Sequence, residues 1–274
     1  MYKFSIIIPT FNSEKTLAVS LQSIQQQSIK NIEVLVMDGG STDGTLQIAS
    51  QFATQLEDLH IYTERDKGIY DAMNKAMEKA TGDWLFFMGS DDFFYETTVL
   101  AKIAKAASKS TDVIYGNAKI IGDTGWAKDG DVYDGIFDLP KLLNQNICHQ
   151  SMFYRREFLK KEVGTFSLKY KKSSDWDFNL RCWTKGNFQY LDMIIANFSA
   201  GGFSTHSNDI AISEDFVNNV RSYFKIDLFH PLLNNPKFAF FGDVLRKQKA
   251  EHPLRWKFEK LKKRLSSKIR KFLK

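Results

Sequence analysis

Short β-rich runs alternate with helical segments through the first 120 residues, and this alternation limits the possible folds more than any other feature. The predicted strands lie within residues 3–12, 32–40, 59–64, 83–92 and 112–121. Apolar residues recur at helical spacing between them. Strands joined by helical crossovers pair in parallel. The pattern therefore predicts an α/β fold with a mostly parallel, doubly wound sheet and helices on both faces.

Polar and acidic residues gather directly after four of the predicted strands, at residues 10–12, 38–43, 64–68 and 90–92. In a parallel sheet the carboxyl ends of the strands share one edge, and ligands of doubly wound folds bind in the crevice there. The sequence therefore predicts that these four loops meet at one binding crevice.

Two adjacent acids, Asp91 and Asp92, end an apolar run, and aromatic residues follow at once. Neighbouring carboxylates raise each other's pKa unless a cation or strong hydrogen-bond donors face them. A divalent cation such as Mg²⁺ or Mn²⁺, held by a few carboxylates and by substrate phosphates, would satisfy the pair. A turn with helix-capping acids is the alternative interpretation of so short a motif.

Asp38 stands at the end of the second predicted strand. Its carboxylate could accept hydrogen bonds from a nucleotide base, or it could form an ordinary Asx-turn. The chain contains no phosphate loop of the G-x-G-x-x-G or G-x-x-x-x-G-K type. The phosphates of a bound nucleotide are therefore expected to be held by metal rather than by backbone amides alone.

The regular alternation ends near residue 121. Residues 122–135 are rich in Gly and Asp and predict a hairpin or loop, and residues 139–187 return to helices and short strands. A domain boundary is expected near residue 225, because Pro231, Pro236 and Pro253 interrupt the segments beyond it.

The C-terminal segment 246–274 has thirteen Lys or Arg against two Glu, a net charge of +11, while the other 245 residues carry −5. Its apolar residues recur on one helical face: Leu254, Phe258, Leu261, Leu265, Ile269 and Phe272. A basic amphipathic helix predicts contact with an anionic membrane surface. Packing on the body or on a partner is the alternative. Nucleic-acid binding is not expected, since the body offers no base-reading motif.

Five stretches resemble the inverting glycosyltransferases of family 2, which have the GT-A fold: SIIIPTFN, VMDGGSTDGT, ERDKGIYDAMNKA, TGDWLFFMGSDDF and SSDWDFNLRCW. In this order they cover roughly residues 3–185. The resemblance implies a GT-A domain over 1–225, with a nucleotide-sugar half at about 1–120 and an acceptor half at about 121–225. Residues 226–274 would be a basic helical extension.

The resemblance implies an inverting, metal-dependent transfer of a sugar from a nucleotide-diphosphate sugar, usually a UDP sugar. The acceptor would be a hydroxyl of a glycan or lipid-linked molecule in cell-surface polysaccharide biosynthesis. The family motifs place Pro9, Thr10, Asn12 and Asp66 near the nucleotide, Asp38 at the base, Asp91 and Asp92 in the metal and ribose motif with Mn²⁺ or Mg²⁺, and Asp175 as catalytic base. The family often shows Asp-x-Asp-Asp, whereas the first position here is Gly89, so one potential metal ligand is missing.

Three residues near the predicted base keep alternative interpretations. Asp177 is a second candidate base, but on a helix its carboxylate would point about 200° away from that of Asp175. Only one of the two can then face the crevice. His149 could contact the diphosphate or the acceptor, or pack in the core. Trp176 could stack on a sugar ring or belong to the core.

Two other functions are weaker alternatives. A nucleotidyltransferase acting on sugar phosphates needs the same metal and crevice, but it usually has a basic phosphate loop that PTFNSEKT matches poorly. An inactive binding module of the same fold would not need the four predicted site acids. The chain has two cysteines, no signal peptide and no apolar stretch of about 18 to 20 residues. These features predict a cytoplasmic protein, peripheral at the inner face of the membrane.

Overall fold

The computed structural model describes residues 2–202 and 209–272, without the side chains of residues 263 and 266–272. Its contacts divide the chain into two compact units, residues 1–137 with 146–212 and residues 138–145 with 213–274. The predicted boundary near residue 225, and the division of residues 1–225 into nucleotide-sugar and acceptor halves, stay predictions.

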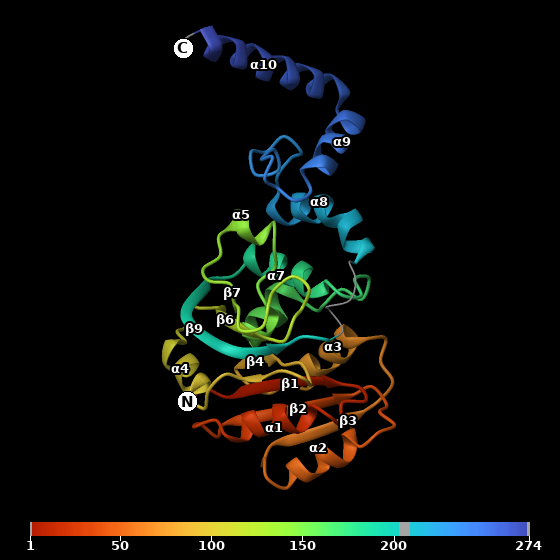
Figure 1. The fold of residues 1–274 in the computed structure, drawn as a ribbon, viewed down its shortest axis with the longest axis vertical. Coiled ribbons are helices and arrows are strands. Elements are labelled where there is room, and N and C mark those ends of the chain that lie inside the picture. The colour runs from red at the N-terminus through yellow and green to blue at the C-terminus, as the bar shows by residue number, and fades with distance from the viewer. Residues whose placement is uncertain (1, 203–208, 273–274) are drawn as a thin grey trace. The chain divides into compact units, whose positions relative to one another are not determined.

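In the part of the chain that the structure describes, the first unit is built on a nine-stranded sheet (Figure 1). Its strands are β1 (Phe4–Thr10), β2 (Ile32–Asp38), β3 (Leu59–Thr63), β4 (Trp84–Phe87), β5 (Phe93–Phe94), β6 (Val113–Ile121), β7 (Val132–Tyr133), β8 (Met152–Arg155) and β9 (Phe188–Ser199). Its helices are α1 (Leu17–Gln25), α2 (Thr45–Ala53), α3 (Ile69–Lys79), α4 (Val99–Ala106), α6 (Arg156–Phe158) and α7 (Ser174–Trp183). A 3₁₀ turn spans His149–Ser151, and a π-helical turn spans Leu159–Val163.

The strand order is β3-β2-β1-β4-β8-β6-β9-β5, and β7 pairs with β6. Strands β3, β2, β1 and β4 are parallel, as are β6 and β9, whereas β8 runs antiparallel between β4 and β6. The predicted α/β fold with a mostly parallel sheet is thus confirmed. Because Thr10 pairs with Asp38 at the ends of β1 and β2, the loops after these strands start side by side.

Alternate residues of the central strands face opposite layers, because strand side chains alternate between the two faces of a sheet. One buried cluster joins Phe4, Ile6 and Ile8 of β1 to apolar residues of α1, α2 and α4. On the other face, the ring of Phe87 in β4 lies 5.1 Å from that of Phe166, which stacks on Phe178 of α7 at 4.1 Å. Helices therefore cover both faces and hold the strand ends in place.

The second unit is helical. It contains α5 (Leu139–Leu142), the part of α8 (Ile210–Phe224) from residue 213 onward, α9 (Phe241–Glu251) and α10 (Pro253–Phe272). In its core, Phe216 of α8 stacks on Phe240 at 4.3 Å. The predicted basic segment is helical in α10, but the side chains of Ile269 and Phe272 lie outside the described residues. Within residues 2–202 and 209–272, every helix is too short or too polar to cross a bilayer.

Candidate functional site

A cavity of about 680 Å³, called here the large cavity, opens at the carboxyl ends of β1, β2, β3 and β4. Its lining includes five residues that the sequence placed at a nucleotide: Pro9, Thr10, Asn12, Asp66 and Asp91. Small-molecule sites in proteins commonly have volumes of about 300 to 1,000 Å³. A crevice therefore lies at the predicted edge of the sheet, and its volume suits a small-molecule ligand.

A second hollow of about 60 Å³, called here the small cavity, shares Asp91 and Gly89 with the large cavity. Asp92, His149 and Lys172 also line it. The two adjacent acids and His149 therefore meet at one place, although they are far apart in the sequence.

The two adjacent carboxyl groups differ in environment. Asp92 is 1% exposed, and its Oδ1 accepts a 2.9 Å hydrogen bond from the backbone N–H of Ser199. Burial and the charge of Asp91 raise the pKa of Asp92 to about 8, against the opposing effects of the Ser199 amide and the Gln150 side chain. Burial also raises the pKa of Asp91, which is half-buried and lines both cavities. The pair needs positive charge to be doubly ionised at neutral pH.

Gly89 explains why this chain departs from the Asp-x-Asp-Asp pattern. A Cβ atom at residue 89 would lie 2.5 Å from Oδ2 of Asp92 and 2.7 Å from Oδ1 of Asp91. A side chain there would displace both carboxylates. The observed positions of the Asp91 and Asp92 carboxylates therefore require a residue without a side chain at position 89.

The acidic pair fits a divalent cation. It offers hard carboxylate oxygens, which Mg²⁺ and Mn²⁺ prefer. The buried carboxyl of Asp92 has a raised pKa, as expected for a charge that lacks a counter-ion. A Cβ at Gly202 would come within 3.1 Å of Oδ2 of Asp91, so the glycine keeps the approach to that oxygen open.

Asp175 lies in the first turn of α7 and accepts hydrogen bonds at both carboxylate oxygens. The hydroxyl of Tyr70 lies 3.0 Å from Oδ1 and 2.8 Å from the carbonyl oxygen of Lys172, so these two acceptors share its one proton. Nδ2 of Asn146 donates to Oδ2 at 2.7 Å. Nδ1 of His149 lies 3.2 Å from the same Oδ2. The Asp175 side chain is 16% exposed. These contacts hold the carboxylate in one orientation beside the small cavity.

Asn146 is itself held by a buried chain of hydrogen bonds. Nδ2 of Asn179 donates to Oδ1 of Asn146 at 2.8 Å, and the hydroxyl of Tyr154 donates to Oδ1 of Asn179 at 2.7 Å. Asn179 and Tyr154 are both 0% exposed. Because Oδ1 of Asn146 accepts from Asn179, its amide nitrogen must point at Asp175.

Asp177 faces away from Asp175, as the helical spacing predicts. Its Oδ2 lies 3.0 Å from Nε of Arg181, and the Asp177 side chain is 2% exposed. The guanidinium of Arg181 also donates to the carbonyl oxygens of Val163 and Thr165. Asp177 therefore belongs to a structural ion pair, whereas Asp175 contacts His149 and Tyr70, which line the small cavity.

The other predicted residues have mixed surroundings. Asp38 is 1% exposed and accepts hydrogen bonds from the backbone N–H groups of Gly40 and Ser41, so it forms the Asx-type turn. Its contact with a base stays a prediction. Among the described residues, the buried Oγ1 of Thr10 has no hydrogen-bond partner, and it lies at the large cavity. Trp176 is half-buried on α7, and its role in binding sugar stays a prediction.

Sequence reasoning missed several residues of this site: Tyr70, Asn146, Gln150, Lys172, Asn179 and Ser199. Tyr70 lies on a helix that the sequence predicted, but nothing in the sequence indicated that its buried hydroxyl contacts Asp175. The Asn146 and Gln150 positions flank His149 in an irregular segment. A polar residue four positions after Asp175, on the same helical face, was the available signal for Asn179.

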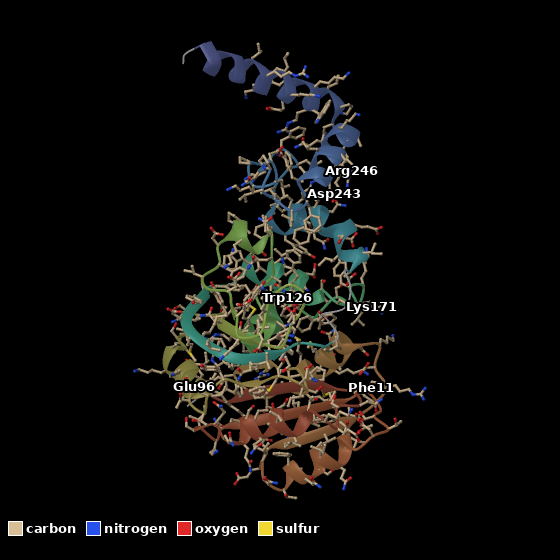
Figure 2. All side chains as sticks on the ribbon, in the orientation of Figure 1. Phe11, Glu96, Trp126, Lys171, Asp243 and Arg246 are labelled. Atoms are coloured by element: carbon tan, nitrogen blue, oxygen red, sulfur yellow. The ribbon has the colours of Figure 1, made fainter. Side chains whose placement is uncertain are left out.

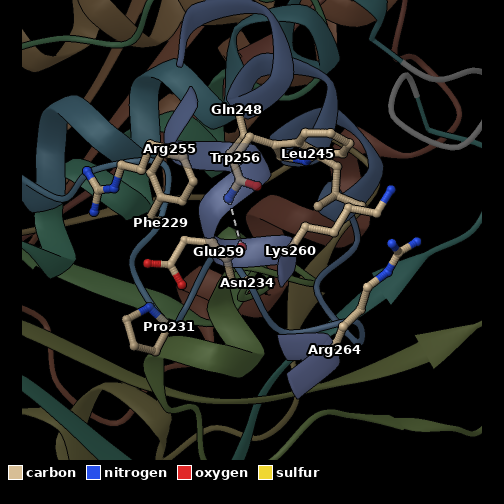
Figure 3. A pocket seen from close by; sticks show the side chains of 10 residues that line it. All are labelled: Phe229, Pro231, Asn234, Leu245, Gln248, Arg255, Trp256, Glu259, Lys260 and Arg264. Carbon is tan, nitrogen blue, oxygen red and sulfur yellow. Dashed lines mark hydrogen bonds between the residues drawn. The ribbon is translucent and has the colours of Figure 1, made fainter. Parts of the chain in front are cut away.

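A larger hollow of about 820 Å³ lies within the second unit, between α9, α10 and the segment before them (Figure 3). Two of the cations that line it, Arg255 and Lys260, already have partners. The guanidinium of Arg255 lies 4.1 Å from the ring centre of Phe229 and pairs with Asp227, and Lys260 lies over the ring of Trp256 at 4.7 Å. This hollow gathers no acidic pair, so it is not a candidate for the catalytic site.

A group of potential metal ligands, Glu33, Asp58 and His60, lies at the opposite end of the strands. The ammonium of Lys3 lies 2.8 Å from Asp58 and 3.8 Å from Glu33. The lysine supplies the positive charge that a cation would bring. This group is therefore a structural ion cluster.

Residues 5–163 match the family model described as Glycosyl transferase family 2. The chain is 42% identical over 208 residues to the PGL/p-HBAD biosynthesis glycosyltransferase of Mycobacterium bovis (strain BCG / Pasteur 1173P2), which covers 73% of this chain and 78% of that protein. It is 27% identical over 189 residues to the putative glycosyltransferase EpsE of Bacillus subtilis (strain 168), covering 67% of this chain and 68% of the relative.

Two solved structures share the fold. S. aureus TarS 1-349 in complex with UDP-GlcNAc has a TM-score of 0.65 at 22% identity, covering 90% of this chain and 73% of that one. The mannosyltransferase PcManGT from Pyrobaculum calidifontis, in complex with GDP-Man and Mn2+, has a TM-score of 0.61 at 16% identity, covering 97% and 80%.

Proposed function

The chain belongs to glycosyl transferase family 2, and on this premise we propose that it transfers a sugar from a nucleotide-diphosphate sugar to an acceptor hydroxyl with inversion. It is a glycosyltransferase with a GT-A fold. One observation carries the proposal: His149 contacts Asp175 and also lines the small cavity with Asp91 and Asp92. A candidate base and a candidate metal site therefore lie next to the same histidine.

The donor is proposed to be a UDP sugar in the large cavity. Its volume of about 680 Å³ is adequate, and the unpartnered Oγ1 of Thr10 can bond to a ligand. TarS, whose fold is similar, was solved with UDP-GlcNAc. The proposed donor half is about residues 1–120, and the proposed acceptor half is about residues 121–225. Hexosyl and N-acetylhexosaminyl transfer are both compatible with this scheme.

Asp91 and Asp92 are proposed to hold Mn²⁺ or Mg²⁺ together with the donor. When bound, the cation would supply positive charge to the diphosphate as it leaves. Asp91, which lines both cavities, is proposed to face the diphosphate, while the buried Asp92 lies behind Asp91 on the protein side of the cation. Lys172 and His149 also line the small cavity and would add donors on the diphosphate side.

Asp175 is proposed as the general base, and the hydrogen bonds suggest which oxygen acts. A carboxylate oxygen has two lone pairs. Among the described residues, Oδ2 meets both Asn146 and His149, whereas Oδ1 meets Tyr70. The second lone pair of Oδ1 would accept the acceptor's hydroxyl proton as the new C–O bond forms and the bond to the diphosphate breaks. Burial and the charge of Asp175 raise the pKa of Tyr70 well above its usual value, so the phenol stays a donor.

We propose that the enzyme acts at the inner face of the cytoplasmic membrane, bound to the membrane surface through α10. On α10, Leu254 is 80% exposed, Phe258 65% and Leu261 56%. Lys and Arg occupy the other faces of this helix. Exposed apolar side chains beside many cations suit the boundary between anionic headgroups and acyl chains. The acceptor would then be a glycan or lipid-linked molecule at that surface.

A donor screen tests the proposed function. Thermal unfolding is measured with UDP-, GDP- and dTDP-sugars, each with Mn²⁺ and with EDTA, because a ligand that binds only the native state raises the melting temperature. The donor that stabilises the protein is then incubated with candidate acceptors, and the anomeric configuration of the product is read by NMR. Failure of every nucleotide sugar to bind, or a product with retained configuration, would contradict the proposal. Release of pyrophosphate would instead favour a nucleotidyltransferase.

A further inference from the structure

Trp126 stands on the loop between β6 and β7, and 53% of its side chain is exposed (Figure 2). Exposing so large an apolar ring gives up stabilisation that burial would bring, at about 25 cal/mol per Å² of apolar surface. Exposed aromatic residues with an amphipathic ring are typical anchors of binding sites. The position of Trp126 beside the proposed catalytic site makes it a candidate for ligand binding.

The turn that carries Trp126 is closed by its own hydrogen bonds. The backbone N–H of Thr124 donates to the carbonyl of Ala127 at 3.1 Å, and the N–H of Ala127 donates to Oγ1 of Thr124 at 2.9 Å. The N–H of Gly122 donates to Oδ1 of Asp129 at 2.8 Å. Trp126 is therefore presented by an ordered turn, which lowers the entropic cost of binding a ligand.

The Trp126 ring contacts both sides of the proposed site through two other rings. It lies 6.1 Å from the ring centre of Phe198, which lines the small cavity with Asp91 and Asp92. It also lies 5.2 Å from the ring centre of Tyr133. The Tyr133 hydroxyl donates to the backbone carbonyl of Asn146 at 2.7 Å.

Asn146 completes this second connection, because its side chain donates to Asp175 at 2.7 Å. The three rings of Trp126, Tyr133 and Phe198 thus pack together, with Phe198 buried and Trp126 the exposed member. They connect the exposed loop to the cavity wall and to the support of the base. An acceptor must reach both the base and the cavity, and Trp126 is the ring of this group that a molecule approaching from solvent can contact.

We propose that Trp126 binds the terminal pyranose ring of the acceptor by stacking, an assignment that rests on the proposed sugar transfer. The face of an indole carries partial negative charge, and one face of a pyranose presents polarised C–H groups to it. Stacking leaves the hydroxyls at the rim of the pyranose free, and the proposal requires that one of them lies at Asp175. An exposed tryptophan on an ordered turn thereby selects a ring-shaped acceptor rather than a flexible polyol.

The test uses the full chain saturated with UDP and Mn²⁺. The probes are methyl α- and β-pyranosides of glucose, galactose, mannose, rhamnose, fucose and N-acetylglucosamine. Binding is measured by ligand-observed saturation-transfer NMR, which detects weak complexes. We expect at least one pyranoside to bind the unaltered protein, about tenfold weaker binding to Trp126→Ala, and near-normal binding to Trp126→Phe. Val19→Ala is the control, because Val19 is 50% exposed on α1, and it should bind like the unaltered protein.

Two further readouts separate this proposal from the proposed function. UDP affinity and slow donor hydrolysis by water should be the same in Trp126→Ala and in the unaltered protein. If neither the unaltered protein nor Trp126→Ala binds UDP or hydrolyses the donor, the proposed sugar-transfer function itself is rejected. Equal pyranoside binding by Trp126→Ala would overturn the stacking role. Binding of 4-nitrophenol or octanol, with no pyranoside bound, would overturn it too, because the surface would then recognise an aglycone.

Discussion

Nδ1 of His149 lies 3.2 Å from Oδ2 of Asp175, although 25 residues separate them in the chain. His149 begins a 3₁₀ turn just before β8, and Asp175 is in the first turn of α7. The imidazole also lines the small cavity with the acidic pair. A substitution at Asp175 is therefore expected to affect the acidic pair through His149, and the reverse. For this reason the base and the metal site are tested by separate variants.

Asp175→Asn keeps the shape of the side chain but removes its ability to take a proton. We expect kcat to fall about 10² to 10⁴-fold, as for loss of a general base, with donor affinity nearly unchanged. Single-turnover kinetics and donor titration measure the two quantities.

Asp177→Asn is the matched control, since it lies on the same helix and pairs with Arg181. It should lower the unfolding free energy by about 1 to 3 kcal/mol, because the neutral amide pairs less strongly with Arg181 than the carboxylate does. The kcat of the folded protein should stay within a few-fold of the unaltered value. The reverse pattern, with activity lost only in Asp177→Asn, would move the base to the other carboxylate.

Asn146→Ala removes the 2.7 Å hydrogen bond to Asp175 and leaves the buried Asn179 with one partner fewer. The base then samples several orientations, so we expect kcat to fall about tenfold or more while the donor KM stays the same. Asn31→Ala is a structural control, because Nδ2 of Asn31 donates to the carbonyl of Tyr2 just before β2, at the opposite end of the strands from the base. An Asn146→Ala enzyme with full kcat would show that the base needs no such support.

Gly89→Ala tests the space under the acidic pair. Because its Cβ would approach Asp92 to 2.5 Å and Asp91 to 2.7 Å, both carboxylates must move. We expect at least tenfold weaker Mn²⁺ binding by calorimetry, with the fold retained. Gly242→Ala is the control, since its nearest neighbour would be 3.9 Å away, and its Mn²⁺ affinity should not change. Unchanged Mn²⁺ affinity in Gly89→Ala would place the metal elsewhere.

The buried Asp92 predicts a pH dependence of stability in metal-free protein. Its pKa is raised from 3.8 to about 8, so the folded state keeps a proton that the unfolded state releases. This stabilisation is complete below about pH 4 and is lost as the pH rises toward 8, at no more than about 1.4 kcal/mol per pH unit. Asp92→Asn should lack this slope. Urea unfolding in EDTA at several pH values measures it, and parallel curves for the two proteins would contradict the assignment.

A triple change, Leu254→Ser with Phe258→Ser and Leu261→Ser, removes exposed apolar area from α10 while keeping its charge. Vesicles of equal parts phosphatidylglycerol and phosphatidylcholine should bind this variant much more weakly, while turnover of soluble substrates stays the same. Binding of the unaltered protein should also fall with salt, since surface charges are screened over about 8 Å at physiological ionic strength. Equal sedimentation of both proteins with vesicles would give α10 another role.

The sequence predicted the sheet because strands β1 to β4 are short apolar runs that alternate with amphipathic helices. The local hydrophobic pattern is enough to identify elements of this kind. It predicted the crevice because parallel strands share one edge, so Asp66 and Asp91 had to converge. It also predicted that Asp175 and Asp177 diverge, because helical geometry alone decides this. These features depend on spacing within one or two elements.

The supports of the base were not predictable in the same way. Asn146 comes from an irregular segment, and Tyr70 reaches Asp175 across 105 residues of sequence. Such contacts depend on tertiary packing, which no local period encodes. Gly89 was visible in the sequence as a missing acid, but its meaning needed the distances from a Cβ to the two carboxylates.

The loop of residues 122–131 closes on itself through Thr124, Ala127 and Asp129, and joins the sheet at Ile120, whose N–H and carbonyl pair with Asp131 and Gly130. Most of the hydrogen bonds named here lie within the loop itself, so the segment can be exchanged as a unit. If Trp126 binds the acceptor as proposed, exchanging this loop for the corresponding loop of a relative would change the acceptor preference of the enzyme. A graft that keeps the packing of Ala127 against the buried cluster of Ala118, Ile120 and Phe198 would leave the sheet beneath it unchanged.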